Sequence, residues 1–473
     1  MVFSSSIFLL YFFPIFLLLY YLSDRKYKNL VALVASLIFY SWGAPLFIFV
    51  VLGSIFIDFY LIKAMHASGG KKRHWLITAS VVLNIGLLVY FKYMNFFVEN
   101  VNVILGALGA NSLHWTKIAL PIGISFFSFQ KFTYGIDVYR GKHKPLDSVW
   151  DLCLYILLFP QLIAGPIVRY SEIADQLHNR HDYETVDNRL LGFYRFVIGL
   201  AKKVLIANVM GAEADRIFAM QPIDMSTGTA WIGILAYTFQ IYFDFSGYSD
   251  MAIGIGRMIG FRFPENFNNP YISQNITEFW RRWHITLGRW MRDYLYIPLG
   301  GNRVNNKWRL YFNLWVVFLI SGFWHGASWT FIAWGAFHGL FLILDRLFLL
   351  KLSAKIGKYP SIIFTFLVAI IGWVLFRSET LGFAFAYIGR LFAFDFSTFE
   401  YFDREFWVML AVALIFSFLT AFRFGFNLEK KILYSEYTKS GYFIMAIVAM
   451  VLLFVCTASI SASGFNPFIY FRF

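Results

Sequence analysis

Apolar runs of roughly 20 residues recur from one end of this chain to the other, and they limit what it can fold into. Of its 473 residues, 59% are hydrophobic and 14% are charged, whereas soluble domains average about 25% charged residues. A helix needs roughly 20 apolar residues to cross about 30 Å of hydrocarbon. We therefore predict an all-α polytopic membrane protein, and a water-soluble fold is excluded.

The predicted spans alternate with short loops, several of which are rich in lysine and arginine. The spans lie near residues 5–22, 29–44, 46–63, 76–92, 117–138, 190–210, 228–256, 310–322, 325–344, 360–376, 406–422 and 441–460. With re-entrant segments included, about 11–13 membrane helices are expected. The net charge of +14 is concentrated in the loops, which is typical of the cytoplasmic side of a membrane protein and not of a nucleic-acid-binding surface. Residues 1–473 show no soluble domain and no repeat, so one membrane domain is predicted, with both termini outside the cytoplasm.

One segment breaks the alternation of spans and loops. Leu152–Val168 lies between two basic stretches, and its apolar run contains Pro160, Gly165 and Pro166. Proline removes a helical N–H and glycine loosens the backbone, so a straight span is disfavoured. A broken element that enters and leaves on the cytoplasmic side fits both observations. Such backbone is tolerated at membrane depth only where protein or a cavity surrounds it, so this segment predicts an internal cavity.

Two of the nine histidines, His325 and His338, fall within predicted spans. An ionisable side chain at membrane depth is costly and marks functional pathways. For His325 the alternative is a hydrogen bond to a neighbouring helix, but Gly322 and Gly326 are expected to open the backbone around it. Three nearby tryptophans are expected to wall a cavity: Trp324, Trp329 and Trp334. His338 is predicted to be structural.

No metal site is predicted. On one helix, His325 and His338 would lie about 20 Å apart and face different sides. Cys153 and Cys456 sit in apolar runs without the spacing of thiolate ligands, so they are interpreted as core residues. The glycines at 254, 256 and 260 lack dinucleotide-binding spacing and are interpreted as sites of close helix packing.

Residues 279–296 are predicted to form an amphipathic helix at the cytoplasmic interface. Apolar residues recur there at helical spacing, namely Trp280, Trp283, Leu287, Met291 and Tyr294. The arginines of this stretch, including Arg281 and Arg282, either anchor it to lipid headgroups or meet an anionic donor, such as the phosphates of coenzyme A or of a phosphopantetheine carrier. His284 falls on the apolar side and is the second catalytic candidate.

The predicted span near 228–256 carries a group of polar side chains: Asp244, Ser246, Tyr248, Ser249 and Asp250. Two carboxylates within a span suggest a polar cavity wall or an ion site. The alternative is capping and hydrogen bonding at a helix break near Gly247.

Several long motifs in this chain resemble one known family. They are PIGISFFSFQKFTYGIDVYRG, FPQLIAGPIVR, DFSGYSDMAIGIGRMIGFRFPENFNNPYIS, FWRRWHITLGRWMRDYLYIPLGG and SGFWHGASWTFIAWGAFHG. Together they are similar to the membrane-bound O-acyltransferase superfamily. Within it they look most like the bacterial branch of alginate O-acetylation, peptidoglycan O-acetylation and teichoic-acid D-alanylation.

The resemblance implies a central tunnel in which a cytoplasmic acyl thioester meets an acceptor from the other side. It implies that His325 is the catalytic histidine and His284 the second family histidine. The donor would be acetyl-CoA or an acyl carrier protein, and no bound cofactor is expected. A neutral histidine is a good base near neutral pH. The candidates for the tunnel and for donor binding are Asp244, Ser246, Tyr248, Arg281, Arg282, Trp324 and Trp329.

Residues 461–473 are predicted to form an extracytoplasmic aromatic tail, which includes the sequence GFNPFIYFRF. This tail resembles the aromatic tyrosine motif at the C-terminus of some family members. Tyr470 either accepts the acyl group before an SGNH-type extracytoplasmic transferase takes it, or belongs to an aromatic belt at the membrane interface.

Two classes of function fit these features. The first is a membrane O-acyltransferase of the bacterial inner membrane that moves an acyl group, expected to be acetyl, for O-acetylation of an alginate-like polysaccharide, peptidoglycan or another cell-surface glycan. The second is a transporter or flippase in which Asp244, Asp250 and His325 form a proton relay. Transporters usually show internal repeats, and their absence here favours the acyltransferase.

Overall fold

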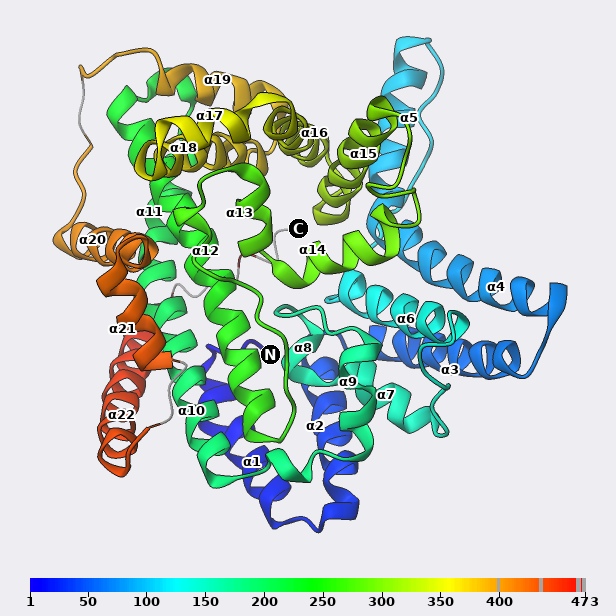
Figure 1. Ribbon diagram of the computed structural model, residues 1–473. Helices are drawn as coiled ribbons and strands as arrows, with labels where there is room; N and C mark the ends of the chain where they lie inside the picture. Colours follow the sequence, from blue (N-terminus) through cyan, green and yellow to red (C-terminus); the bar gives the residue numbers. More distant parts are fainter. Residues whose placement is uncertain (398–399, 434–436, 465–468, 470–473) are drawn as a thin grey trace. The chain divides into compact units, whose positions relative to one another are not determined.

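The computed structural model describes residues 1–397, 400–433, 437–464 and 469. All regular secondary structure within these residues is helical, which confirms the predicted fold class (Figure 1). The chain divides into two compact units. The first comprises Met1–Arg189 and Ile255–Phe263, and the second comprises Leu190–Gly254 and Pro264–Phe473.

The first unit is built mainly from nine helices that follow one another along the chain. They are α1 (Phe13–Leu22), α2 (Lys28–Gly43), α3 (Phe47–His66), α4 (Gly70–Leu88), α5 (Met94–Ala107), α6 (Ile124–Tyr139), α7 (Val149–Leu157), α8 (Phe159–Leu162) and α9 (Tyr170–His178). The predicted span near 117–138 begins later than expected, at Ile124. The chain turns at Gly123, whose φ is +78° and where a Cβ would lie 2.8 Å from the carbonyl oxygen of Leu162.

The second unit contains the remaining helices, although α10 begins and α12 ends in the first. They are α10 (Val186–Ala201), α11 (Asn208–Phe218), α12 (Thr227–Met258), α13 (Ile276–Arg282), α14 (Ile285–Met291), α15 (Lys307–His325), α16 (Trp329–Leu344), α17 (Leu350–Ile356), α18 (Lys358–Arg377), α19 (Leu381–Leu391), α20 (Arg404–Phe418), α21 (Arg423–Leu433) and α22 (Lys439–Ala462). A π-helical segment, η5 (Lys202–Ala207), connects α10 to α11.

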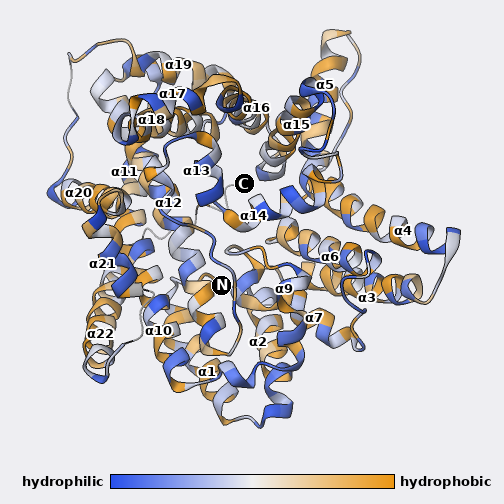
Figure 2. Cartoon of the chain, viewed as in Figure 1, coloured by the Kyte–Doolittle hydropathy of each residue, from blue (hydrophilic) through white to orange (hydrophobic). Residues whose placement is uncertain are grey.

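Six helical segments among the described residues are long and apolar enough to cross a membrane. They are Phe47–His66, Gly70–Ala107, Trp329–Ile356, Lys358–Arg377, Arg404–Ala421 and Lys439–Ala462. Figure 2 shows hydrophobic residues along much of α3, α4 and α22. The other predicted spans also fall on helices, such as α2, α12 and α15, but these are shorter or more polar. For them, membrane crossing stays a prediction.

The helix break predicted within Leu152–Val168 is confirmed. α7 ends before Leu158, and the short helix α8 contains Pro160 near its start. Every residue of the segment is buried, and the N–H of Phe159 donates to Oγ of Ser36 over 3.1 Å. Protein therefore surrounds the broken backbone, as irregular structure at membrane depth requires. That the segment enters and leaves on the same side stays a prediction.

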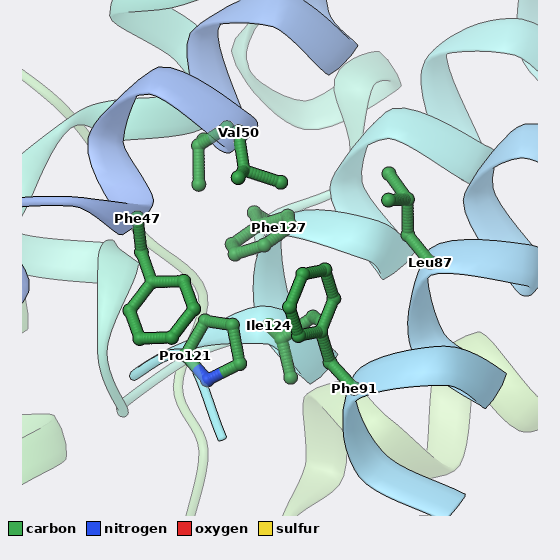
Figure 3. A pocket seen from close by; sticks show the side chains of 8 residues that line it. Phe47, Val50, Leu87, Phe91, Pro121, Ile124 and Phe127 are labelled. Carbon is green, nitrogen blue, oxygen red and sulfur yellow. The ribbon is translucent and has the colours of Figure 1, made fainter. Parts of the chain in front are cut away.

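The first unit also contains a small apolar pocket between α3, the end of α4 and α6. Figure 3 shows its lining residues, which are Phe47, Val50, Val51, Leu87, Phe91, Pro121, Ile124 and Phe127. No polar side chain lines this pocket. It offers no acid, base or nucleophile and is a packing feature.

The second unit packs around α12, which runs without interruption past Gly247. A Cβ on Gly199 of α10 would lie 2.5 Å from the carbonyl oxygen of Gly247, and one on Gly254 would lie 2.6 Å from that of Gly192. The glycines therefore let the backbones of α10 and α12 approach closely. The helix break suggested near Gly247 is wrong, whereas the packing role predicted for Gly254 is confirmed.

Candidate active site

The hairpin of α15 and α16 carries His325. Asn306 caps the start of α15 by accepting from the N–H of Trp308, and Ser328 caps α16 by accepting from the N–H of Phe331. The two helices lie side by side (Figure 1). His325 is the last residue of α15, so the hairpin turn sets its position.

Glycines let the two helices of this hairpin touch. A Cβ on Gly322 would lie 2.2 Å from the carbonyl oxygen of Phe331, and one on Gly335 would lie 2.3 Å from that of Phe318. Gly326 is covered by the ring of Phe331, at 2.1 Å from its would-be Cβ. The expectation that Gly322 and Gly326 open the backbone is therefore wrong, because Phe331 fills the space beside both of them.

His325 lies in an aromatic enclosure and is 8% exposed. Its ring centroid is 4.9 Å from that of Trp324, 5.2 Å from that of Trp334 and 5.2 Å from that of Phe376. Beside it is a cavity of about 10 Å³, room for about one water molecule. The His325 cavity is lined by Ile241, Phe245, Trp283, His325, Trp334, Trp373, Phe376 and Ile469.

Two of the three tryptophans predicted to wall this cavity do not line it, because Trp324 is buried elsewhere beside His325 and Trp329 is exposed. Trp324 and Trp334 are 3% and 1% exposed, and Trp334 lines the cavity. Trp329, at the first position of α16, is 56% exposed, so it does not wall the cavity. The cavity is lined instead by Trp283, at the end of α13, and by Trp373 of α18.

Trp334 lies between His325 and His338. The centroid of its ring is 5.2 Å from that of His325 and 5.1 Å from that of His338. His325 ends α15 and His338 lies on α16, so the prediction that both lie on one helix about 20 Å apart is wrong. Among the described residues, no group of three or more histidine, cysteine, aspartate and glutamate side chains could hold a metal ion.

The predicted amphipathic helix over 279–296 is broken at His284. α13 ends at Arg282 and α14 begins at Ile285. His284 adopts left-handed φ and ψ values of 44° and 53°, a conformation that costs a non-glycine residue of order 1–3 kcal/mol and that clusters at functional sites. The predicted apolar side is nevertheless buried, because Trp283, Leu287 and Met291 are each 4% exposed.

Asn266 determines how His284 is oriented. Oδ1 of Asn266 lies 3.0 Å from Nδ1 of His284, 2.8 Å from Oγ1 of Thr286 and 3.4 Å from the backbone N of Thr286. Because a backbone N–H can only donate, the shared Asn266 atom is the oxygen, and Nδ1 of His284 must carry its proton. The Nε2 atom of the neutral ring then holds the lone pair.

His284 is 2% exposed, and burial lowers its pKa to about 3. It is therefore a neutral imidazole near pH 7. Its ring centroid is 4.7 Å from that of Phe245 and 6.2 Å from that of Trp324. Since Trp324 also packs against His325, the fold brings both catalytic candidates close to one indole ring.

The two carboxylates of α12 both form ion pairs, and several polar residues of this helix border a larger cavity. Asp244 pairs with Lys203, whereas Asp250 pairs with Arg195 and Lys202. A cavity of about 470 Å³ is lined by Ser246, Ser249 and Asp250, together with Asn266 and apolar residues of α10, α20 and α22. The polar cavity wall predicted from two carboxylates therefore includes Asp250 but not Asp244. Tyr248 is buried and is not among the lining residues.

The two arginine candidates lie at the end of α13. Arg281 is exposed, whereas Arg282 pairs with Glu278 over 2.8 Å and donates to the carbonyl oxygen of Asn268. Neither is placed against His325. Tyr470 lies outside the described residues.

Comparison with known proteins places the sequence in one family. The family model described as MBOAT, membrane-bound O-acyltransferase family, matches residues 140–356. A probable alginate O-acetylase AlgI of Pseudomonas putida is 42% identical over 491 aligned positions, which cover 100% of each chain. The chain belongs to the membrane-bound O-acyltransferase family.

Other relatives of this acyltransferase act on different polymers, as their names state. A peptidoglycan O-acetyltransferase of Helicobacter pylori is 39% identical over 416 positions, 80% of this chain and 78% of the relative. A teichoic acid D-alanyltransferase of Bacillus subtilis is 30% identical over 273 positions, 55% of this chain and 67% of the relative. Membership makes the chain a multi-pass membrane enzyme of acyl transfer and sets the transporter alternative aside.

Sequence reasoning missed three residues of this acyltransferase site. Asn266 supports His284, Lys203 pairs with Asp244, and Ile469 lines the His325 cavity. Lys203 gave a visible signal, because it is a lysine within the apolar run near 190–210. No local pattern marked Asn266 or Ile469, since their roles depend on contacts between distant parts of the chain.

Proposed function

We propose that this enzyme moves an acetyl group from a cytoplasmic thioester for O-acetylation of an extracytoplasmic polysaccharide, in a bacterial inner membrane. The observation that carries the proposal is that His325 is buried beside a small, mainly aromatic cavity and lies within the MBOAT family match. Relatives named for alginate O-acetylation and peptidoglycan O-acetylation support acetyl as the group and a polysaccharide as the final acceptor.

In this proposal His325 acts as the general base. It takes the proton of an acceptor hydroxyl while the acceptor oxygen attacks the thioester carbonyl carbon. The tetrahedral intermediate then collapses, the carbon–sulfur bond breaks, and the leaving thiolate recovers the proton from the imidazolium. His325 returns to its neutral form, and the acetyl group is now an ester. The aromatic enclosure keeps bulk water away from the reacting atoms.

His284 is proposed to position the donor. The hydrogen bond between its Nδ1–H and Oδ1 of Asn266 fixes the orientation of the ring. Phe245 contacts His284 and also lines the His325 cavity, while Asn266 lines the larger cavity. His284 therefore contacts one residue of each cavity. This position suits a residue that lies between the donor arm and the reacting carbonyl.

The larger cavity is proposed to hold the pantetheine arm of the donor. This arm is neutral and amphipathic, and the cavity of about 470 Å³ combines apolar side chains with the amides of Asn266, Asn268 and Asn269. Its cations, Arg195 and Lys202, are paired with Asp250, which leaves little charge for phosphates. The donor phosphates would therefore lie outside it, where exposed arginines such as Arg281 are available.

Tyr470 is proposed as the first acceptor. The preceding residue, Ile469, lines the His325 cavity, which supports access of this part of the tail to the base. A phenol has a pKa near 10, lower than that of a sugar hydroxyl, so an acetyl phenol ester stays activated for a second transfer. An extracytoplasmic transferase of the SGNH type would then pass the acetyl group to the polysaccharide.

The test uses purified enzyme and acetyl-CoA labelled in the acetyl group. His325→Ala should lower label transfer to the protein by about 10²–10⁴-fold, the usual contribution of a general base. His114→Ala, which removes an exposed histidine, is the matched control and should keep wild-type transfer. Full transfer by His325→Ala would overturn the proposed role of this histidine.

Tyr470→Phe separates the relay from the acyltransferase chemistry. It removes only the nucleophilic oxygen, so label on the protein should disappear while thioester cleavage in the presence of an added phenol acceptor continues. Mass spectrometry should find the acetyl group on the C-terminal peptide of the wild type only. An acetylated C-terminal peptide in Tyr470→Phe would contradict the relay.

A further inference from the structure

A buried ion pair joins α12 to the π-helical segment η5. Nζ of Lys203 lies 2.9 Å from Oδ1 of Asp244, and the two side chains are 3% and 1% exposed. Removing two charges from solvent costs several kcal/mol per ion, so such a pair is weak evidence of stabilisation alone. The best-attested use of such a buried pair is to fix the orientation of the groups around it.

The second oxygen of Asp244 reaches a residue far away in the sequence. Oδ2 accepts a hydrogen bond from the backbone N–H of Ile469 over 2.8 Å. A hydrogen bond to an ionised carboxylate is stronger than one between neutral groups. Because Lys203 occupies Oδ1, the carboxylate presents Oδ2 to Ile469.

This contact lies directly beside the catalytic candidate. Ile469 is 2% exposed, and its side chain lines the His325 cavity. Ile241, one helical turn before Asp244 on α12, lines the same cavity. The carboxylate therefore fixes the backbone of Ile469 at the place where its side chain meets the cavity.

We infer that Lys203 and Asp244 form a clasp that holds Ile469 at the His325 cavity through its backbone N–H. Both are positioning residues. Lys203 orients the Asp244 carboxylate through Oδ1, and Asp244 binds the main chain through Oδ2, so the clasp is insensitive to the side chain at position 469. The meaning of the clasp for acetyl transfer rests on the proposed relay through Tyr470, but the clasp itself is tested without any activity.

The test is cross-linking between positions 241 and 469. Ile241→Cys and Ile469→Cys are introduced together, with the native Cys153 and Cys456 replaced by alanine, and a short thiol-reactive cross-linker is added to the purified full-length enzyme. Since both positions line one cavity, efficient cross-linking is expected. Single-cysteine variants measure the background.

The clasp is then removed without leaving a buried charge. Lys203→Met with Asp244→Leu replaces the pair by apolar side chains, a change that other buried pairs tolerate or even gain from. We expect the cross-linking rate to fall about tenfold, the size of losing one hydrogen bond to a charged group. A matched variant, Arg377→Met with Asp215→Leu, removes another ion pair of the same unit and should not change the rate.

Further readouts decide the outcome. Asp244→Asn keeps an acceptor oxygen and should retain more cross-linking than Asp244→Leu in the Lys203→Met background. Unchanged cross-linking in the folded Lys203→Met, Asp244→Leu variant would overturn the clasp. If cross-linking falls while acetyl transfer to the tail persists, the clasp stands and the relay through Tyr470 does not need it. If cross-linking is normal in Tyr470→Phe but transfer is lost, the relay is supported independently.

Discussion

His284 donates from Nδ1 to Oδ1 of Asn266 over 3.0 Å, and this one contact decides which nitrogen of a buried histidine carries the proton. Asn266 is itself held in place, because its Nδ2 donates to Oγ of Ser249 and its backbone oxygen accepts from the N–H of Ile285. The orientation of His284 thus rests on a residue 18 positions earlier in the chain.

Asn266→Ala should impair acyl transfer by about tenfold, because it leaves the buried Nδ1–H of His284 and the Thr286 hydroxyl without their acceptor, a loss worth about 1–3 kcal/mol. The measurement is kcat and KM for acetyl-CoA with purified enzyme. A matched change, Asn305→Ala, alters an exposed asparagine and should leave both constants unchanged. Normal kinetics in Asn266→Ala would show that the orientation of His284 is unimportant.

The stability of the enzyme should depend on pH through His284. Burial lowers its pKa from 6.5 to about 3, so below about pH 6.5 the unfolded state binds more protons than the folded state. The stabilisation by neutral His284 is complete above the unfolded pKa and declines as the pH falls toward 3. The midpoint of thermal unfolding in detergent should therefore drop between about pH 7.5 and about pH 5. His284→Gln should show a smaller drop, and an equal drop would refute this assignment.

Gly322→Ala should disrupt the hairpin that carries His325. The added methyl group would lie 2.2 Å from the carbonyl oxygen of Phe331, and backbone atoms cannot move aside as a flexible side chain can. We expect a loss of about 1–3 kcal/mol in stability together with lower activity. Gly382→Ala is the control, because nothing lies within 4 Å of its Cβ. Equal unfolding midpoints for the two variants would argue against close packing of α15 and α16.

Trp334→Ala and Trp329→Ala should have very different effects. Trp334 is 1% exposed and touches His325 and His338, so its removal should cost about 3–5 kcal/mol and most of the activity. Trp329 is 56% exposed, and its removal should change stability by less than about 0.5 kcal/mol. Unfolding midpoints and acetyl transfer of the two variants give the comparison, and similar losses in both would restore Trp329 to the cavity wall.

The predicted topology is tested by labelling single cysteines in intact cells. Asn305→Cys lies in the exposed loop before α15, which the basic residues nearby predict to be cytoplasmic. It should react only with a membrane-permeant reagent. Ser112→Cys, in an exposed loop predicted to be outside, should also react with an impermeant one. The opposite pattern would invert the topology.

The helical fold and the position of His325 were predictable because apolar runs and a tryptophan-rich glycine motif are local features of the sequence. The break in α7 and α8 was also predictable, since Pro160 removes a hydrogen-bond donor wherever it occurs. The break at His284 was not, because Trp283, Leu287 and Met291 keep helical spacing across it. A left-handed non-glycine residue is imposed by its tertiary contacts, here those with Asn266 and Phe245.

The contact between Asp244 and Ile469 was also beyond sequence reasoning. Asp244 was recognised as an unusual carboxylate in a span, but its partner is a backbone N–H, which every residue except proline possesses. Lys203 stands out as a lysine within an apolar run, but no local pattern identifies Asp244 as its partner.

The small volume of the His325 cavity bears on how much donor is lost to hydrolysis. Water competes with any acceptor for an activated acyl group, so a transferase that admits water hydrolyses its donor. With Ile469 in place, the cavity has a volume of about 10 Å³ and hardly more than one water molecule fits. Under the proposed mechanism, steric exclusion of water limits hydrolysis of the donor, so widening this space should raise the ratio of hydrolysis to transfer.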